Sequence, residues 1–204
     1  MGLPAYFAQA PRIALHDALA EFLGAADGGV IDYGYEDAVR LAGHSCPTVA
    51  GAWLMGVAAL RALYPDGLPE RGGVDVAMSA GEDEGTTGVI AQVFTLLTGA
   101  AAGNGFHGIG GRFVRNRLLA YGSGDASAIA TFRRRDTGAA VAVSLDVSSV
   151  QPDPQMRTQM QRALAPTASA AERAAFAVTW QDRVRRLLLD HATDPAVIRV
   201  QACA

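Results

Sequence analysis

The sequence predicts an α+β fold in which a mixed, largely antiparallel sheet packs against apolar helices and further helices follow toward the C-terminus. Residues 47–60 form an uncharged, apolar run of helical length. Residues 129–147 alternate in two runs around an Asp-Thr-Gly turn, which is typical of a β-hairpin. The helical and strand patterns do not alternate regularly along the chain, so a βαβ repeat is not indicated.

The first part of the chain is predicted to be helical. Apolar residues at roughly helical spacing indicate one helix over residues 11–25 and a second over 35–42. A third helix is predicted over residues 47–64, with Pro47 in its first turn. Arg61 is the only charged residue of this third helix, so we expect the helix to be buried on nearly every side.

The remaining elements follow from the same two periodicities. In chain order they are a strand at 74–78, a helix at 87–98, a glycine-rich loop at 103–111, a strand at 113–121, hairpin strands at 129–133 and 141–147, helices at 153–164 and from Ser169, and a strand at 197–201. Ser169 and Glu172 have the spacing of a helix capping box. We divide the chain into an N-terminal helical extension, residues 1–32, and one compact α+β domain, residues 33–204.

The composition of the 204-residue chain excludes several classes of function. All 17 basic residues are Arg, so neither a Schiff-base lysine nor a P-loop lysine is available. The net charge of -3 and a single short basic run, residues 133–135, argue against a nucleic-acid partner. No apolar run reaches the ~20 residues of a membrane span, and the first residues lack a signal-peptide pattern. We therefore expect a soluble, cytoplasmic protein whose cysteines are reduced.

The clearest chemical motif is the segment Gly43-His44-Ser45-Cys46-Pro47. Its His and Cys stand two residues apart where an extended loop enters a helix, so both side chains can turn toward one point. Imidazole nitrogen and thiolate sulfur are suitable ligands for zinc or a similar transition metal. A helix N-terminus also favours the thiolate form of Cys46. The alternative interpretation is a buried Cys at a helix start beside a His that bonds to the backbone.

A metal ion needs further ligands, and the candidates are Glu82, Glu84, His107 and Cys203. Glu82 shares the strand parity of the apolar residues before it, which would point its side chain inward. The acidic turn could instead be a solvated cap of the next helix. His107 could be an exposed loop histidine, and Cys203 an unreactive thiol near the C-terminus.

Other catalytic patterns are weak or absent. Gly103, Gly105 and Gly108 match the spacing of a dinucleotide-binding fingerprint, but that motif requires a strand before it and a helix after it, the reverse of what the sequence predicts here. The sequence contains no G-x-S-x-G motif. A metal-free thiol enzyme, with Cys46 as the nucleophile and His44 as its base, ranks low because residues two apart rarely align for that proton transfer.

Over about residues 33–201 the chain resembles the FmdE family, which takes its name from a subunit of formylmethanofuran dehydrogenase. The resemblance rests first on Gly43-His44-Ser45-Cys46-Pro47, which leads into an apolar helix. Leu96-Leu97-Thr98-Gly99 follows, before the glycine-rich stretch and the hairpin. The third match is Asp194-Pro195-Ala-Val-Ile-Arg-Val200 after the long C-terminal helix.

The resemblance implies an α+β domain with a metal site at His44 and Cys46, and we expect zinc. Many family members carry additional cysteines where this sequence has residues 84–88 and 99–102, and many carry a Cys-x-x-Cys zinc module that is not found here. Any remaining ligands would be carboxylate, His or water. Two hypotheses follow. In the first, the chain is a metal-binding protein that is either oxidoreductase-related or hydrolytic. In the second, it is a non-catalytic accessory or assembly subunit of a molybdenum or tungsten oxidoreductase. The apolar helix at 47–64 further suggests a homodimer.

Overall fold

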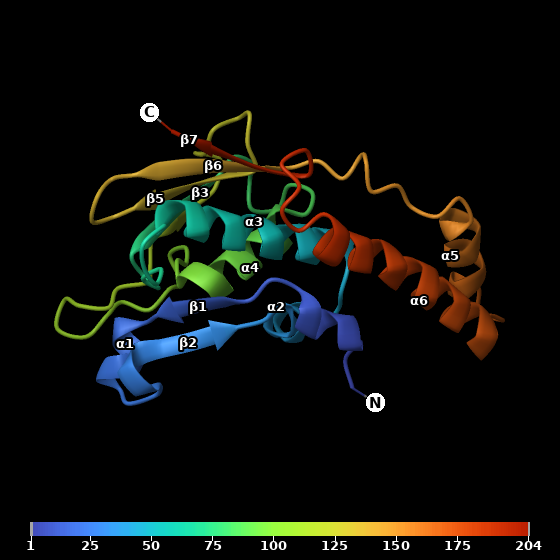
Figure 1. The fold of residues 1–204 in the computed structure, drawn as a ribbon, viewed down its shortest axis with the longest axis horizontal. Coiled ribbons are helices and arrows are strands. Elements are labelled where there is room, and N and C mark those ends of the chain that lie inside the picture. Colours follow the sequence, from blue (N-terminus) through green and yellow to red (C-terminus); the bar gives the residue numbers. More distant parts are fainter. Residues whose placement is uncertain (1, 204) are drawn as a thin grey trace.

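The computed structural model describes residues 2–203 and contains one five-stranded and one two-stranded sheet (Figure 1). The strands are β1 (Ile13–His16), β2 (Val30–Tyr33), β3 (Val74–Met78), β4 (Leu119–Ala120), β5 (Ala130–Arg134), β6 (Ala140–Leu145) and β7 (Ile198–Ala202). The α-helices are α1 (Ala18–Phe22), α2 (Tyr35–Ala42), α3 (Pro47–Leu63), α4 (Thr87–Thr98), α5 (Met156–Leu164) and α6 (Ala170–Arg185). Short 3-10 helices cover Ala5–Gln9 and Asp27–Gly29, and a π-helical turn, Arg186–Asp190, continues α6.

The strand order of the larger sheet is β4-β3-β5-β6-β7. Only β3 and β4 pair in parallel, whereas β3–β5, β5–β6 and β6–β7 are antiparallel. The β5–β6 pair is the predicted hairpin, and its register places Ala130 opposite Val143. The predicted α+β class, with a mixed and largely antiparallel sheet, is therefore confirmed.

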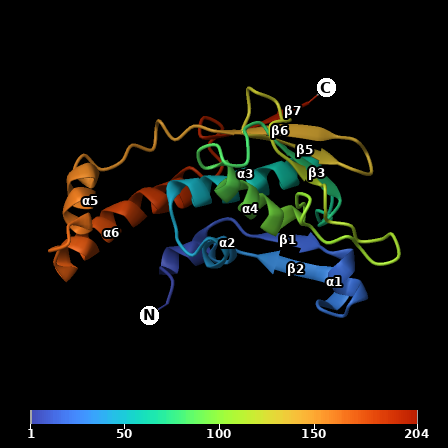
Figure 2. The same cartoon turned by 180° about the vertical axis from the view of Figure 1, so that it is seen from behind.

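The elements form three layers (Figures 1 and 2). The five-stranded sheet covers one side of α3 and α4, and the β1–β2 pair lies with α1 and α2 on the other side of these two helices. Helices α5 and α6 form an arm that projects from the end of the molecule at which α3 begins. The single hydrophobic core extends from Phe7 to Ile198, so the N-terminal segment contributes to the same core as the sheet.

Helix α3 occupies the centre of this arrangement. Buried side chains lie all around the helix, from Val49 at its start to Leu63 at its end. Two glycines let neighbouring elements approach closely. A Cβ at Gly51 would meet the Leu145 side chain of β6, and a Cβ at Gly56 would meet the Leu97 side chain of α4. The expected burial of this helix is confirmed.

Two of the predicted elements are wrong. Residues 11–25 do not form one helix, because Ile13 and Leu15 alternate into the core as strand β1, which pairs with β2. The helix starts only at Ala18, after the Asp17 carboxylate accepts hydrogen bonds from two amides of its first turn. Only β4 forms within the strand predicted at 113–121, because Phe113 and Arg117 have φ of 61° and 58° and cannot lie in an extended strand.

A buried ion-pair network joins the N-terminal segment to the loops around α4. Asp17, which is only 3% exposed, accepts from Arg115 Nη2 at 2.7 Å and from Arg71 Nη1 at 2.9 Å. Arg71 Nε also donates to the Leu96 carbonyl at 3.0 Å. Burial alone would raise the pKa of Asp17, but the hydrogen bonds and the two guanidinium charges lower it overall. Asp17 is thus held as a carboxylate between two cations.

We predict that Asp17→Asn lowers the free energy of unfolding by about 3–5 kcal/mol, because it leaves two guanidinium groups without their counter-charge. The contribution of Asp17 is present above its ordinary pKa of about 4 and is lost as the pH falls toward its lowered pKa in the folded protein. Urea unfolding at neutral and acid pH measures both effects. Asp32→Asn, which removes the exposed Asp32–Arg12 pair, serves as the control and should cost at most about 1 kcal/mol. Equal losses in the two variants would contradict the prediction.

Candidate functional site

The His-x-Cys motif lies in the short loop between α2 and α3. Helix α2 ends at Gly43, and Cys46 is the N-cap of α3, with an extended backbone at φ -149° and ψ 168°. The Cys46 Sγ accepts a hydrogen bond from the Val49 amide at 3.4 Å. Pro47 occupies the first turn, where its missing N–H costs nothing. The sulfur atom therefore lies at the N-terminus of the buried helix, partly exposed to solvent.

The His44 side chain is exposed, and its Nδ1 lies 3.0 Å from the Ala42 carbonyl oxygen. Because a carbonyl can only accept, Nδ1 carries the proton and donates it. The neutral ring then has its lone pair on Nε2, which faces no hydrogen-bond partner within residues 2–203. A backbone carbonyl that fixes the histidine tautomer in this way is typical of metal-binding histidines.

The residue between them, Ser45, is fixed by side chains from distant parts of the chain. Its carbonyl accepts from Trp180 Nε1 at 3.0 Å and from Gln181 Nε2 at 3.1 Å, both on α6. Its hydroxyl lies 2.8 Å from the hydroxyl of the fully buried Tyr35. Tyr6 completes the network by donating to Gln181 Oε1 at 2.7 Å. The loop is thereby attached to α2, to α6 and to the N-terminal segment.

The two tyrosines of this network are held in their neutral form. Burial raises the pKa of Tyr6 to about 12 and raises that of Tyr35 still further. Both phenols therefore keep their protons. No sequence pattern indicated these contacts, since Ser45 and Trp180 are 135 positions apart in the chain.

The other ligand candidates lie elsewhere. Glu82 is exposed, so the inward orientation expected from strand parity is wrong, because β3 ends at Met78 and a turn follows. Glu84 accepts from the Gly81 amide at 3.3 Å within that turn. His107 is exposed in the glycine-rich loop, where its Nδ1 lies 3.1 Å from Asn116 Nδ2.

Within residues 2–203, no three His, Cys, Asp or Glu side chains come together in a way that could hold a metal ion. The loop thus offers at most two protein ligands, His44 and Cys46, whereas zinc sites have three or four. The residues that the structure describes do not form a complete metal centre, and we derive no reaction step through a metal ion. No hydrogen bond joins His44 to Cys46 in the described part of the chain, which also gives no support to a thiol–imidazole pair.

Glu82 lines a groove of about 440 Å³ that runs from the end of α2 at Leu41 along α4 to the glycine-rich loop. Asn104 and Tyr121 contribute further polar groups to this groove. Burial, and secondarily the charge of Glu82, raises the pKa of Tyr121. Glu82 therefore lines this groove and does not form a metal-ligand cluster with His44 and Cys46.

The fold and the loop define an α+β protein with a His and a Cys two residues apart at the start of a buried helix. The family model described as "FmdE, Molybdenum formylmethanofuran dehydrogenase operon" matches residues 41–194, and the chain belongs to the FmdE family. None of its helices within residues 2–203 combines the length and hydropathy that crossing a membrane requires.

Comparison with curated proteins gives no match. Among solved structures, the chain is similar to an FmdE-like protein from Syntrophus aciditrophicus, where FmdE denotes a subunit of tungsten formylmethanofuran dehydrogenase. The two share 17% sequence identity with a TM-score of 0.45, and the match covers 84% of this chain and 72% of the other.

We predict that the double variant Trp180→Phe/Gln181→Leu loosens the loop, because the Ser45 carbonyl loses both of its donors. The unsatisfied carbonyl should cost about 1–3 kcal/mol, and the amides of residues 43–46 should exchange faster with solvent. Hydrogen exchange followed by NMR measures this. Trp53→Phe, which removes the hydrogen bond from Trp53 Nε1 to the Pro11 carbonyl, is the matched control and should leave loop exchange unchanged. Unaltered exchange in the double variant would show that α6 does not fix the loop.

Proposed function

We propose that this FmdE-family protein binds a transition metal ion, zinc in the first instance, through His44 Nε2 and Cys46 Sγ. The observation that carries the proposal is the hydrogen bond from His44 Nδ1 to the Ala42 carbonyl, because it leaves Nε2 as the free lone pair. Cys46 is the N-cap of α3, where its Sγ is partly exposed to solvent and accepts a hydrogen bond from the Val49 amide at 3.4 Å. The remaining coordination positions would be open to water or to groups from another molecule.

The rigid attachment of Ser45 supports this proposal. Two donors from α6 and the Tyr35 hydroxyl hold the residue between the two ligands. A metal ion that bridges ligands two residues apart requires a defined backbone between them, because ordering a mobile loop would consume part of the binding free energy. The hydrogen bonds to Ser45 provide this order from side chains of the chain itself.

Metal analysis of the purified protein is the direct test. We expect zinc to bind the wild-type chain, and His44→Ala and Cys46→Ser each to weaken its affinity by about tenfold or more. His107→Ala and Cys203→Ser are matched controls of the same residue types outside the loop, and they should bind zinc like the wild type. Zinc affinity that is unchanged in both loop variants would contradict the proposal.

The shortage of ligands favours a second function, that of a non-catalytic accessory or assembly protein for a molybdenum or tungsten oxidoreductase. A site with two protein ligands, one exposed and one partly exposed, can accept its remaining ligands from a partner. The description of the matched family, which refers to a molybdenum formylmethanofuran dehydrogenase operon, supports a partner of this kind.

A pull-down from host cells with the tagged chain separates the two functions. An accessory role predicts that the wild-type chain retains a molybdenum- or tungsten-containing oxidoreductase, and that a chelator or Cys46→Ser releases it. The Cys203→Ser variant should retain it as the wild type does. If the chain binds zinc but retains no such enzyme, the result would agree with metal binding and rule out the accessory role.

A further inference from the structure

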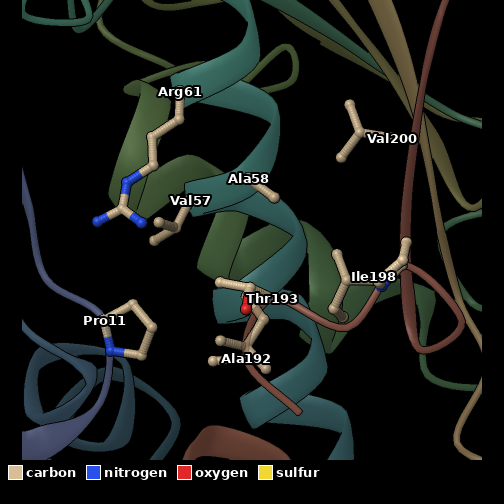
Figure 3. Close-up of a pocket in the computed structure, with 10 residues that line it drawn as sticks. Pro11, Val57, Ala58, Arg61, Ala192, Thr193, Ile198 and Val200 are labelled. Carbon is tan, nitrogen blue, oxygen red and sulfur yellow. The ribbon is translucent and has the colours of Figure 1, made fainter.

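An apolar groove of about 320 Å³ lies on the surface of α3, between β7 and Pro11 (Figure 3). Strand β7 contributes Ile198 and Val200, which are two positions apart and therefore share one face of the sheet. Helix α3 contributes four residues at helical intervals of three and four: Leu54, Val57, Ala58 and Arg61. Residues at these intervals share one side of a helix, so one side of the central helix forms the floor of the groove.

The groove is the place where the middle of α3 reaches the surface. Among residues 49–60, Ala58 is the only one that is not buried. The groove runs from Arg61 at one end to Ala192 and Thr193 at the other (Figure 3). Because nearly all of its lining is apolar, the groove favours an occupant whose hydrocarbon surface is removed from water.

Arg61 is the single charged side chain in the lining of the groove and the only charged residue of α3. Its Nη2 donates to the Arg12 carbonyl at 2.9 Å. Within residues 2–203 no carboxylate forms an ion pair with Arg61, and its Nε and Nη1 have no hydrogen-bond partner. Arg12, by contrast, pairs with Asp32 at 2.8 Å. The groove therefore carries one uncompensated positive charge.

The charge and the apolar lining together specify the chemistry of an occupant. In Figure 3 the Arg61 guanidinium lies beside Val57, so the charged end adjoins the apolar wall. A carboxylate at this end would accept charge-assisted hydrogen bonds from the free guanidinium donors. An ammonium group would meet a like charge there, and a charged group farther along the groove would lose water without gaining a partner. The fitting occupant is an amphiphile with one terminal carboxylate.

We propose that this groove binds a medium-chain aliphatic carboxylate, with the carboxylate at Arg61 and the alkyl chain along α3 toward Ala192 and Thr193. The volume of about 320 Å³ lies at the small end of the roughly 300–1,000 Å³ that ligand sites enclose. A single unbranched chain therefore fits better than a two-chain lipid. This inference is independent of metal binding by His44 and Cys46.

Calorimetric titration of the whole chain with a series of ligands tests the proposal. The affinity should rise by about tenfold for each two methylene groups from hexanoate to octanoate to decanoate, because each buried methylene adds a similar increment. Octan-1-ol and octylamine carry the same chain with no charge and with the opposite charge, and each should bind at least tenfold more weakly than octanoate. No saturable binding of octanoate, or equal affinity for octanoate and octan-1-ol, would overturn the proposal.

Substitutions separate the role of the charge from that of the apolar wall. Arg61→Gln should weaken octanoate binding by about tenfold or more and leave octan-1-ol binding unchanged, whereas Arg61→Lys should retain part of the octanoate affinity. Ala58→Glu, which places an anion in the groove, should abolish octanoate binding. The matched controls are Arg40→Gln on α2 and Ala171→Glu on the exposed side of α6, and both should bind like the wild type. Thermal unfolding checks that each variant is folded.

NMR of the wild type with octanoate gives an independent readout of the position and direction of the ligand. Nuclear Overhauser contacts should join the methylene next to the carboxylate to Val57, and the terminal methyl group to Ala192 or Thr193. Contacts with another surface alone, or octanoate affinity that is the same in Arg61→Gln as in the wild type, would overturn the proposal. An octanoate affinity that falls as the protein self-associates would assign the groove to a second copy of the chain and overturn it as well.

Discussion

The burial of α3 on nearly every side is the constraint from which the architecture follows. A helix without a polar face must be covered all round, and here the sheet covers one side while α4, α2 and the N-terminal segment cover the rest. Gly51 and Gly56 bring the sheet and α4 close to opposite parts of the helix. The Asp17 network ties the N-terminal segment to Arg71 in the loop before β3 and to Arg115 in the loop after α4. Covering α3 thus requires residues from nearly the whole chain.

The same constraint fixes the candidate site. Because the close-packed core holds α3 in place, the position of the helix N-terminus is well defined. Cys46 is the residue that caps this end of the helix. The hydrogen bonds from α6 to Ser45 connect the projecting arm directly to the segment between His44 and Cys46. An FmdE-family fold here presents His44 and Cys46 on a loop that distant side chains hold in place, and residues 2–203 bring no third His, Cys, Asp or Glu side chain beside them.

Local patterns predicted most of the elements, and contacts distant in the chain explain the rest. Helices α3 and α4 and the β5–β6 hairpin follow from periodicity alone. Strand β1 has only four residues, too few for its alternation to stand out against a helical spacing. The pairing of Asp17 with Arg115, 98 positions apart, and the hydrogen bond of Trp180 to Ser45 depend on tertiary packing, which spacing does not encode. The motif at residues 43–47 could be recognised because its candidate ligands are close together in the chain. The other proposed ligands would have to be brought to it by the fold, and the fold does not do this.

His44 and Cys46 are proposed to act together as ligands of one metal ion. A crystal structure of zinc-loaded protein, with anomalous diffraction data collected on both sides of the zinc absorption edge, tests this directly. We expect one anomalous peak within about 2.0–2.3 Å of His44 Nε2 and Cys46 Sγ. A loop without a peak in fully loaded crystals, or a peak bound by other side chains alone, would contradict it.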